Sequence, residues 1–363
     1  MTTTVNNKSE VVQSGTTISI DAMGGDLGPA AIVAGIVRVA QKNKRIHFLL
    51  HGQEEQLRKL VAKRQSLKGR VTIIDSVEVI KMEDKPSHVV RHGKATSMWS
   101  AIDSVRDGDA SVCVSCGNTG ALMAISMVRL RKLNGVNRPA IAILWPSSNP
   151  MGFNVMLDVG ADVRADPKDL LQYALMGVSY ARNGLGIAKP RVGLLNVGTE
   201  EHKGRSELKE AYSKIEHCQL EANFVFEGFV EGGDIPGSKV DVIVTDGFTG
   251  YVALKTAEGT ASLIGYLLRE AFRFSPLSKL ASILAFTSLN RFKMRIDPRR
   301  VNGGVFLGLN GTVVKSHGSA DATGIEAAIK LAFELSKNDF LQKVAARVAY
   351  AGAMDNDVYD DAN

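Results

Sequence analysis

The chain has 363 residues, of which 45% are hydrophobic and 23% charged, and its formal net charge is +6. This composition is typical of a globular protein with enough residues for one large core or two lobes. No segment approaches the run of roughly 18 apolar residues that spans a membrane, and the polar N-terminus lacks the charged-then-apolar order of a signal peptide. We therefore expect a cytoplasmic protein, and we expect no nucleic-acid partner.

Strand and helix patterns alternate along almost the whole chain. The predicted strands are Thr17–Asp21, Ile46–His51, Val71–Asp75, Ser111–Ser115, Ala140–Trp145, Phe153–Asp158, Arg191–Asn196 and Val240–Thr245. The predicted helices run from Pro29 to about Lys42 and over Glu54–Arg64, Ala95–Arg106, Ala121–Leu133, Pro167–Asn183, Arg205–Cys218 and Gly250–Arg273. Several strands are apolar almost without alternation, which indicates burial of both faces. The sequence therefore predicts an α/β fold with a doubly wound, largely parallel sheet.

One pair of strands departs from the parallel pattern. Only Ser147–Gly152 separates Ala140–Trp145 from Phe153–Asp158, which is too short for a helical crossover, so these strands should pair as an antiparallel arm. We find no internal repeat and no linker. The prediction is a single α/β domain over residues 16–350, between a disordered extension (1–15) and an acidic tail (351–363).

The three cysteines predict no disulfide framework. Cys113 and Cys116 have the spacing of a redox motif, but they lie along a predicted buried strand, and no second pair completes a zinc site. Cys218 lies far from both in the sequence. We therefore expect neither a redox role nor a metal role for these residues.

Five loops after predicted strands are rich in glycine and in polar side chains. They are Asp21–Asp26, Gly117–Gly120, Asn196–Gly204, Asp246–Gly250 and the segment around Lys315–Ser319. Ligands of open α/β sheets bind at the carboxyl ends of the strands, and a glycine turn before a helix N-terminus suits phosphate. One such loop is a weak indication, but five predict one polar pocket.

Six motifs along the chain resemble one enzyme family. They are, in order, D-A-M-G-G-D, S-x-G-N-T-G-A-L-M-A, L-D-V-G-A, P-R-V-G-L-L-N-x-G-T-E-E-x-K-G, V-D-V-x-V-x-D-G-F-T-G and K-S-H-G. Together they look like the phosphate acyltransferases of bacterial fatty acid and phospholipid synthesis. Two departures are small: Cys116 stands where a small residue such as alanine is expected, and N-G-G-V-F-L from Asn302 replaces Y-G-G-A-P-L at the expected rim of the pocket.

The resemblance implies transfer of a long-chain fatty acyl group from acyl carrier protein to inorganic phosphate. The product, an acyl phosphate, would enter phospholipid (phosphatidic acid) synthesis through a downstream glycerol-3-phosphate acyltransferase. The resemblance also implies a homodimer and a fold of the isocitrate dehydrogenase and phosphotransacetylase type.

The residues themselves fit this chemistry. The chain has no G-x-S-x-G elbow and no cysteine beside a plausible base, so we expect no covalent acyl-enzyme. Phosphate is itself a nucleophile that needs alignment and an oxyanion site. We predict that Lys203 and Lys315 neutralise phosphate and that Asn118 holds phosphate or the oxyanion. His317 is the predicted proton donor to the departing thiolate.

The rest of the predicted phosphate site consists of glycines, threonines and aspartates from the same loops. They are Asp21, Gly24, Gly25, Asp26, Gly117, Thr119, Gly120, Gly198, Thr199, Asp246, Gly247, Thr249, Gly250 and Gly318. We expect the three aspartates to orient the lysines. A divalent cation is possible there but not favoured, because no loop has the spaced oxygen ligands of a cation site. We predict neither a metal nor a cofactor.

Two other functions stay open. A phosphotransacetylase-like enzyme would use short-chain acyl-coenzyme A in place of long-chain acyl carrier protein. A non-catalytic, membrane-associated scaffold would use the basic segment described next but would leave the five loops unexplained. The chain lacks the G-x-G-x-x-G of nicotinamide dehydrogenases and the P-loop of nucleotide hydrolases.

The stretch Ala271–Ile296 has no acidic residue and is strongly amphipathic. Its apolar residues at helical spacing include Leu277, Leu280 and Leu284, and its basic residues include Arg291, Lys293 and Arg295. A buried helix pair with basic ends is one interpretation. We favour a protruding segment that inserts its apolar face into the anionic inner surface of the cell membrane, which makes the protein peripherally associated. Acyl carrier protein, typically acidic, is the alternative partner of this surface.

Overall fold

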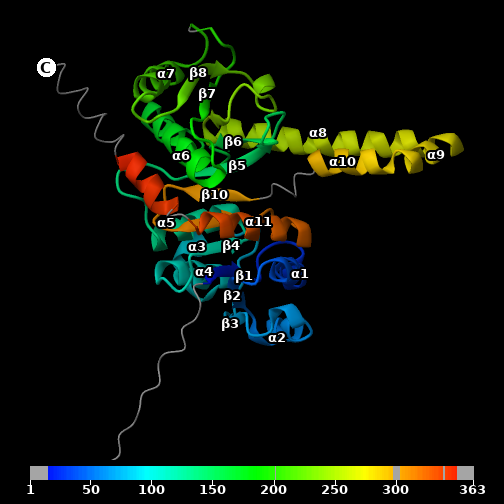
Figure 1. Cartoon of the computed structure of the whole chain (residues 1–363). Helices are drawn as coiled ribbons and strands as arrows, with labels where there is room; N and C mark the ends of the chain where they lie inside the picture. Colours follow the sequence, from blue (N-terminus) through cyan, green and yellow to red (C-terminus); the bar gives the residue numbers. More distant parts are fainter. Residues whose placement is uncertain (1–14, 201, 297–302, 338–339, 350–363) are drawn as a thin grey trace, which may run out of the picture.

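The structure, a computed structural model, describes residues 15–200, 202–296, 303–337 and 340–349, with the backbone alone for 293–296 (Figure 1). The predicted acidic tail and all but Gly15 of the predicted N-terminal extension lie outside these ranges. The described strands form one sheet in the order β3 (Val71–Asp75), β2 (Ile46–Gly52), β1 (Thr16–Asp21), β4 (Val112–Ser115), β11 (Thr312–Lys315), β10 (Gly304–Leu307), β5 (Ala140–Pro146), β6 (Phe153–Leu157), β9 (Val242–Val244), β7 (Arg191–Leu195) and β8 (Val225–Val230).

Two parallel blocks make up this sheet. Strands β3, β2, β1, β4 and β11 pair in parallel, and so do β6, β9, β7 and β8. Between the blocks, β10 is antiparallel to both β11 and β5, and β5 is antiparallel to β6. Three reversals of direction leave the second block running opposite to the first. The predicted antiparallel pair is confirmed, and it lies inside the sheet between the two blocks.

Helices cover both faces of the sheet, as expected of a doubly wound fold. They are α1 (Gly28–Lys42), α2 (Glu54–Ala62), α3 (Pro86–His92), α4 (Ser97–Arg106), α5 (Thr119–Arg129), α6 (Pro167–Leu185), α7 (Ser206–Cys218), α8 (Gly247–Arg273), α9 (Pro276–Leu284), α10 (Phe286–Ile296) and α11 (Ala322–Leu335), with short 3-10 helices η1 (Gln65–Leu67), η2 (Gly93–Ala95) and η3 (Gly232–Asp234). Helices α1, α6 and α11 share one hydrophobic core, and α4 and α5 share the other.

Helix α6 explains much of the first core. Asp166 caps its N-terminus in a reciprocal capping box with Asp169, and Pro167 occupies the first turn, where a missing N–H costs nothing. Tyr173 and Tyr180 are fully buried. The predicted start of this helix at Pro167 is confirmed.

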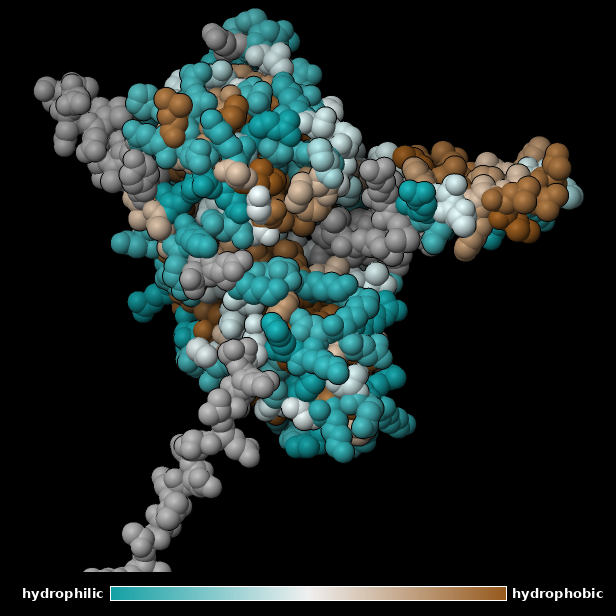
Figure 2. Space-filling view, in the orientation of Figure 1, coloured by the Kyte–Doolittle hydropathy of each residue, from teal (hydrophilic) through white to brown (hydrophobic). Residues whose placement is uncertain are grey.

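The helices α8, α9 and α10 form a projection from the body of the molecule (Figure 1). In its outer part the large apolar side chains are exposed: Phe274 is 89% exposed, Leu277 76% and Leu284 80%. Figure 2 shows these apolar residues gathered over the projection. The interpretation of this stretch as a buried helix pair is therefore wrong for its described side chains, and the prediction that it protrudes is confirmed. No helix in the described part of the chain is long and apolar enough to cross a membrane.

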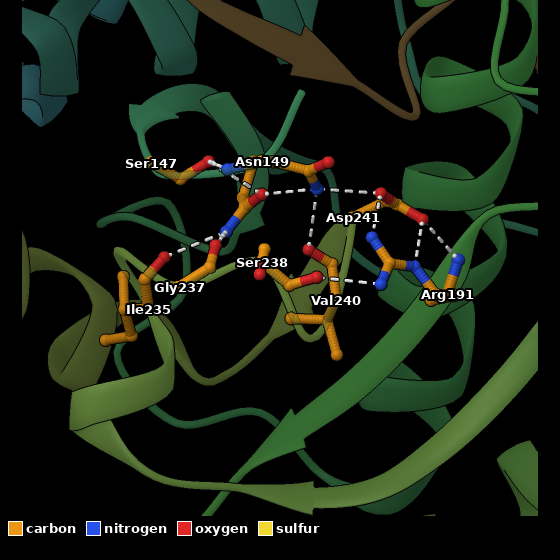
Figure 3. A network of polar contacts seen from close by, with 9 residues as sticks. Ser147, Asn149, Arg191, Ile235, Gly237, Ser238, Val240 and Asp241 are labelled. Atoms are coloured by element: carbon orange, nitrogen blue, oxygen red, sulfur yellow. Dashed lines mark hydrogen bonds and ion pairs between the residues drawn. The ribbon is translucent and has the colours of Figure 1, made fainter. Parts of the chain in front are cut away.

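A buried polar network fixes the turn between β5 and β6 (Figure 3). The Asn149 amide nitrogen donates to the Asp241 carboxylate (2.8 Å), which also receives the Arg191 guanidinium at Nε (3.0 Å) and Nη2 (2.9 Å). The fully buried Asn154 donates to the carbonyls of Ile235 (2.9 Å) and Gly237 (3.0 Å). Its own oxygen accepts from the Ser147 hydroxyl and from Asn149. This network connects the turn to the loop before β9 and to the start of β7.

Because Asn154 satisfies several buried groups at once, Asn154→Ala should lower the free energy of unfolding by about 2–3 kcal/mol. Urea denaturation measures the loss. Asn310 is the matched control: it is exposed and its amide makes one hydrogen bond, to the Lys132 carbonyl. Asn310→Ala should change stability by no more than about 0.5 kcal/mol. Equal losses in the two variants would contradict a stabilising role for the network.

Candidate active site

Strands β1, β4 and β11 end side by side. Their pairing aligns Asp21 with Ser115 and Ser115 with Lys315, so three polar side chains stand in one row at the carboxyl ends of parallel strands. Helix α5 begins directly after β4 at Thr119, and Asn118 caps it by accepting from the Ala121 N–H (3.0 Å).

Asp21 is buried and organises the row. Its carboxylate accepts from the hydroxyls of Ser97 and Ser115, both at 2.7 Å. Burial raises its pKa, and these hydrogen bonds oppose the increase. A Cβ at Gly24 would lie 2.6 Å from Asp21 Oδ2 and 2.7 Å from the Gly117 nitrogen, so only glycine fits where this loop crosses the next one. The Asp21 carboxylate therefore orients serines, and no lysine of the described residues forms a hydrogen bond or ion pair with it.

The loop after β1 also contacts the loop after β11. The Asp26 N–H donates to the Gly318 carbonyl at 2.8 Å. Gly25 has a φ of +91°, and a Cβ there would lie 2.9 Å from the Cys116 Cβ and 3.0 Å from the Gly318 oxygen. Three of the five predicted loops thus meet at one place.

A cavity of about 470 Å³ opens beside these loops. Its polar end is lined by Asp26, Thr119, Lys255, Glu258, Lys315, Ser316, His317 and Gly318. Its apolar wall consists of Ile141, Ile143, Leu144, Trp145 and Pro146 from β5, of Tyr251, Leu254, Ala257 and Ala261 from α8, and of Val159. The cavity therefore places charged groups at one end of an apolar compartment.

Lys315 lies at the polar end and is only 9% exposed. Its ammonium donates to the carbonyls of Cys116 (3.2 Å) and Ser316. Burial lowers its pKa to about 8, although Cys116, Asp21 and Asp26 act in the opposite direction. Because an anion in the cavity would stabilise the ammonium, Lys315 is suited to bind one.

His317 is exposed, and both of its ring nitrogens make hydrogen bonds. Nδ1 lies 2.9 Å from the Ser319 hydroxyl, and Nε2 lies 3.3 Å from the Lys255 ammonium. Burial, and then the charges of Lys255 and Lys315, lower its pKa below the usual value. The resting imidazole is therefore neutral near pH 7. The predicted role of His317 as proton donor to the departing thiolate stays a prediction, and a neutral imidazole would first accept the proton that it then donates.

Asn118 and its neighbours mainly build the turn. The Asn118 amide donates to the carbonyls of Met82 (2.7 Å) and Asp84 (3.0 Å), and so holds the loop before α3 against α5. Its predicted contact with phosphate or oxyanion stays a prediction, and the geometry favours a positioning role. Gly120 packs against Pro86, where a Cβ would lie 2.8 Å from the proline ring. Of this turn, Thr119 lines the cavity.

The other two predicted loops follow strands of the second block. Lys203 is half-exposed, pairs with Glu200 at 2.8 Å, and packs across Gly198, while Thr199 is exposed. None of these residues lines the cavity. Three of the five predicted loops, those after β1, β4 and β11, contribute lining residues to the cavity, so the expectation of one pocket from all five stays a prediction for the loops after β7 and β9. The predicted phosphate contacts of Lys203, Gly198 and Thr199 stay predictions.

The loop after β9 serves the start of α8. The Asp246 carboxylate caps α8 by accepting from the Thr249 N–H (2.8 Å), and it also receives Arg205 at 2.6 Å. Gly247 and Gly250 lie so close to the carbonyls of Asp162 and Asp158 that side chains there would collide. Asp246 therefore pairs with an arginine and not with a lysine, and these residues position α8 against the cavity.

Sequence reasoning missed the contribution of α8 to the site. Lys255 and Glu258 lie in a long amphipathic helix, where lysine and glutamate usually face solvent. Both line the cavity, and their side chains form an ion pair at 2.8 Å. The three-residue spacing of the pair was the only available signal, and such pairs are common on helix surfaces.

The cysteines are buried. Burial raises the pKa of Cys116 to about 11 and that of Cys113 further, which disfavours a reactive thiolate in either. Within the described ranges, no three His, Cys, Asp or Glu residues come together as a metal-binding group.

Comparison with known proteins identifies the family. A family profile described as "Fatty acid synthesis protein" matches residues 16–343. The phosphate acyltransferase of Ruegeria pomeroyi is 68% identical over 340 residues, which cover 94% of this chain and 92% of that protein. The chain belongs to the phosphate acyltransferase family. The phosphate acyltransferase of Dinoroseobacter shibae is 69% identical over 93% of this chain and 88% of its own length. The protein is therefore an acyltransferase, as the motifs predicted.

Solved structures support the fold. A phosphotransacetylase from Streptococcus pyogenes matches with a TM-score of 0.57 at 18% identity, covering 90% of this chain and 95% of that one. A phosphotransacetylase from Staphylococcus aureus matches with a TM-score of 0.54 at 14% identity, covering 89% and 94%. The predicted phosphotransacetylase-type fold is confirmed.

The close approach of Gly25 to the Cys116 Cβ and to the Gly318 carbonyl oxygen yields a prediction for this acyltransferase. Gly25→Ala should separate the loops after β1 and β11 and reduce kcat/KM by about 10- to 100-fold, since a displacement of about 1 Å has effects of that size. Steady-state kinetics on the purified variant measure it.

Gly28→Ala is the control. Gly28 also has a positive φ, of +66°, but a Cβ there would meet nothing within 4 Å. Its replacement should cost about 1 kcal/mol of stability from backbone strain and leave activity near that of the wild type. If both variants lose activity alike, the loop contact is not the cause.

Proposed function

We propose that this acyltransferase transfers a long-chain fatty acyl group from acyl carrier protein to inorganic phosphate and so forms an acyl phosphate for phospholipid synthesis. The observation that supports it is the lining of the cavity: charged residues from α8, from β11 and from the loops after β1 and β11 gather around His317, and apolar residues of β5 and α8 line the same cavity. Phosphate suits the charged residues and an alkyl chain the apolar ones.

The reaction balances without an enzyme nucleophile. An oxygen of the hydrogen phosphate dianion attacks the thioester carbonyl carbon, so that a C–O bond forms and the C–S bond breaks. The proton of hydrogen phosphate ends on the departing sulfur, which leaves as a thiol. His317, neutral at rest, is suited to accept this proton and then to give it up, because neighbouring positive charges make its imidazolium acidic. This role requires neither a cofactor nor a metal.

The closest rival is a phosphotransacetylase-like reaction with a short-chain acyl-coenzyme A donor. A short acyl chain needs little apolar surface, whereas many apolar residues line this cavity, among them Trp145, Leu254 and Tyr251. The lining therefore suits a longer chain. A non-catalytic scaffold is excluded by the membership of the acyltransferase family.

Incubation of the purified protein with phosphate and either palmitoyl-acyl carrier protein or acetyl-coenzyme A tests the proposal. We expect acyl phosphate, detected by mass spectrometry, mainly from the long-chain donor. Lys315→Ala should raise the KM for phosphate by about 10- to 100-fold, since it removes a charge-assisted hydrogen bond. Lys203→Ala should have a smaller effect, because Lys203 does not line the cavity. Faster turnover of acetyl-coenzyme A, or a stable acyl-protein adduct, would contradict the proposal.

We further propose that the projection seats the protein on the inner face of the cell membrane, where a homodimer would deliver acyl phosphate to a downstream glycerol-3-phosphate acyltransferase. The exposed apolar residues of α9 support this, since a monomeric protein rarely leaves so large an apolar surface in water. Arg291 is exposed at the start of the basic segment, while the side chains of Lys293 and Arg295 lie outside those described. Acyl carrier protein is the alternative partner of this surface.

Vesicle flotation separates the two partners. Leu280→Glu/Leu284→Glu should abolish flotation with anionic phosphatidylglycerol vesicles, because it places charges on the apolar face. Both leucines are at least half-exposed, at 54% and 80%, so the variant should still fold. Leu220→Glu is the control: Leu220 is 84% exposed and lies outside the projection. Unchanged flotation with a raised KM for acyl carrier protein would assign the surface to the carrier instead.

A further inference from the structure

We propose that Lys255 of helix α8 is a phosphate-binding residue of this site, with its ammonium held in place by Glu258 and His317 before phosphate arrives. This inference rests on the proposed function, because it names a second cation for the same phosphate. It assigns to Lys255 the part that the sequence suggested for Lys203.

The position of Lys255 carries the inference. Its ammonium lies 2.8 Å from Glu258 Oε2 and 3.3 Å from His317 Nε2, and all three residues line the cavity. The ammonium also lies 5.6 Å from the centre of the Tyr251 ring. An ammonium has three N–H donors. Two of them are used by Glu258 and His317, and the third is available to a phosphate oxygen.

The charges at the polar end require a second cation. A phosphate dianion brings two negative charges close to Asp26 and Glu258, which line the same cavity. Lys315 is almost completely buried and donates to two backbone carbonyls, whereas the Lys255 side chain is 39% exposed toward the open space. Lys255 and Lys315 are the lysines among the described residues that line the cavity. Their two positive charges equal the two negative charges of the dianion, whereas Lys315 alone would offset only one of them.

Helix α8 extends from the second block of the sheet to the loop after β11, and this places Lys255 in the site. The helix starts after β9, in the second block, yet its third turn meets His317 in the loop after β11, in the first block. The phosphate site is thereby shared by both halves of the sheet, although the loops after β7 and β9 do not line it.

The experiment compares Lys255→Met with Lys255→Arg and with a matched control, Lys337→Met. Lys337 repeats the local environment of Lys255: it pairs with a glutamate three residues away (Glu334, 2.9 Å), lies over an aromatic ring four residues away (Phe333, 4.1 Å) and is 40% exposed, but it lies outside the cavity. We expect Lys255→Met to raise the KM for phosphate by about 10- to 100-fold and to change the KM for the acyl donor by less than about twofold. Lys255→Arg should recover most of the affinity, and Lys337→Met should behave as the wild type.

A binding measurement without acyl donor separates this inference from the proposed function. A ligand stabilises the state it binds, so inorganic phosphate should raise the melting temperature of the wild type and of Lys337→Met. The rise should be much smaller for Lys255→Met. Circular dichroism checks that each variant is folded. If phosphate protects Lys255→Met and the wild type equally, Lys255 does not bind it and the inference fails alone. If phosphate does not protect the wild type and no acyl phosphate forms, both fail.

Discussion

The hydrogen-bonded register of β1, β4 and β11 is the constraint on which the site depends. Parallel pairing aligns Asp21, Ser115 and Lys315 in one row, so the ends of three strands separated widely in the sequence deliver their loops to one place. Register in a sheet buried on both faces is set by the apolar side chains that must point into each core. The chemistry of the polar end is therefore determined by strands in which almost every residue is buried.

The reversal of strand direction through β10 and β5 is the second constraint. It separates two parallel blocks and places the apolar strand β5 between them, so that its side chains become one wall of the cavity. The loops after β7 and β9 contribute no lining residue to that cavity, although Val159 after β6 does. Helix α8 compensates, since Asp246, Gly247 and Gly250 let it start close to the loop after β6 and cross to the first block.

The sequence was informative wherever a local rule determines the structure. The apolar runs of β4 and β9 and the start of α6 at Pro167 follow from such rules, and the structure agrees. The direction of the second block does not follow from a local rule, because it depends on the pairing of β10 with β5, which lie more than 150 residues apart in the sequence. Lys203 and Lys315 both lie in glycine-rich loops, and nothing local distinguishes the buried lysine in the cavity from the exposed one beside Glu200.

Helix α8 links the two unusual surfaces of the molecule. Its first half lines the cavity as far as Ala261, and only two residues later Leu263 and Ile264 begin the exposed apolar stretch that continues into α9. A residue near Ala261 and Leu263 therefore lies close to both regions, and its replacement would change cavity and surface together. Substitutions in α9 avoid this ambiguity because no described residue of α9 lines the cavity or is buried. The position of a substitution along α8 and α9 thus decides whether it reports on the cavity or on the exposed apolar surface.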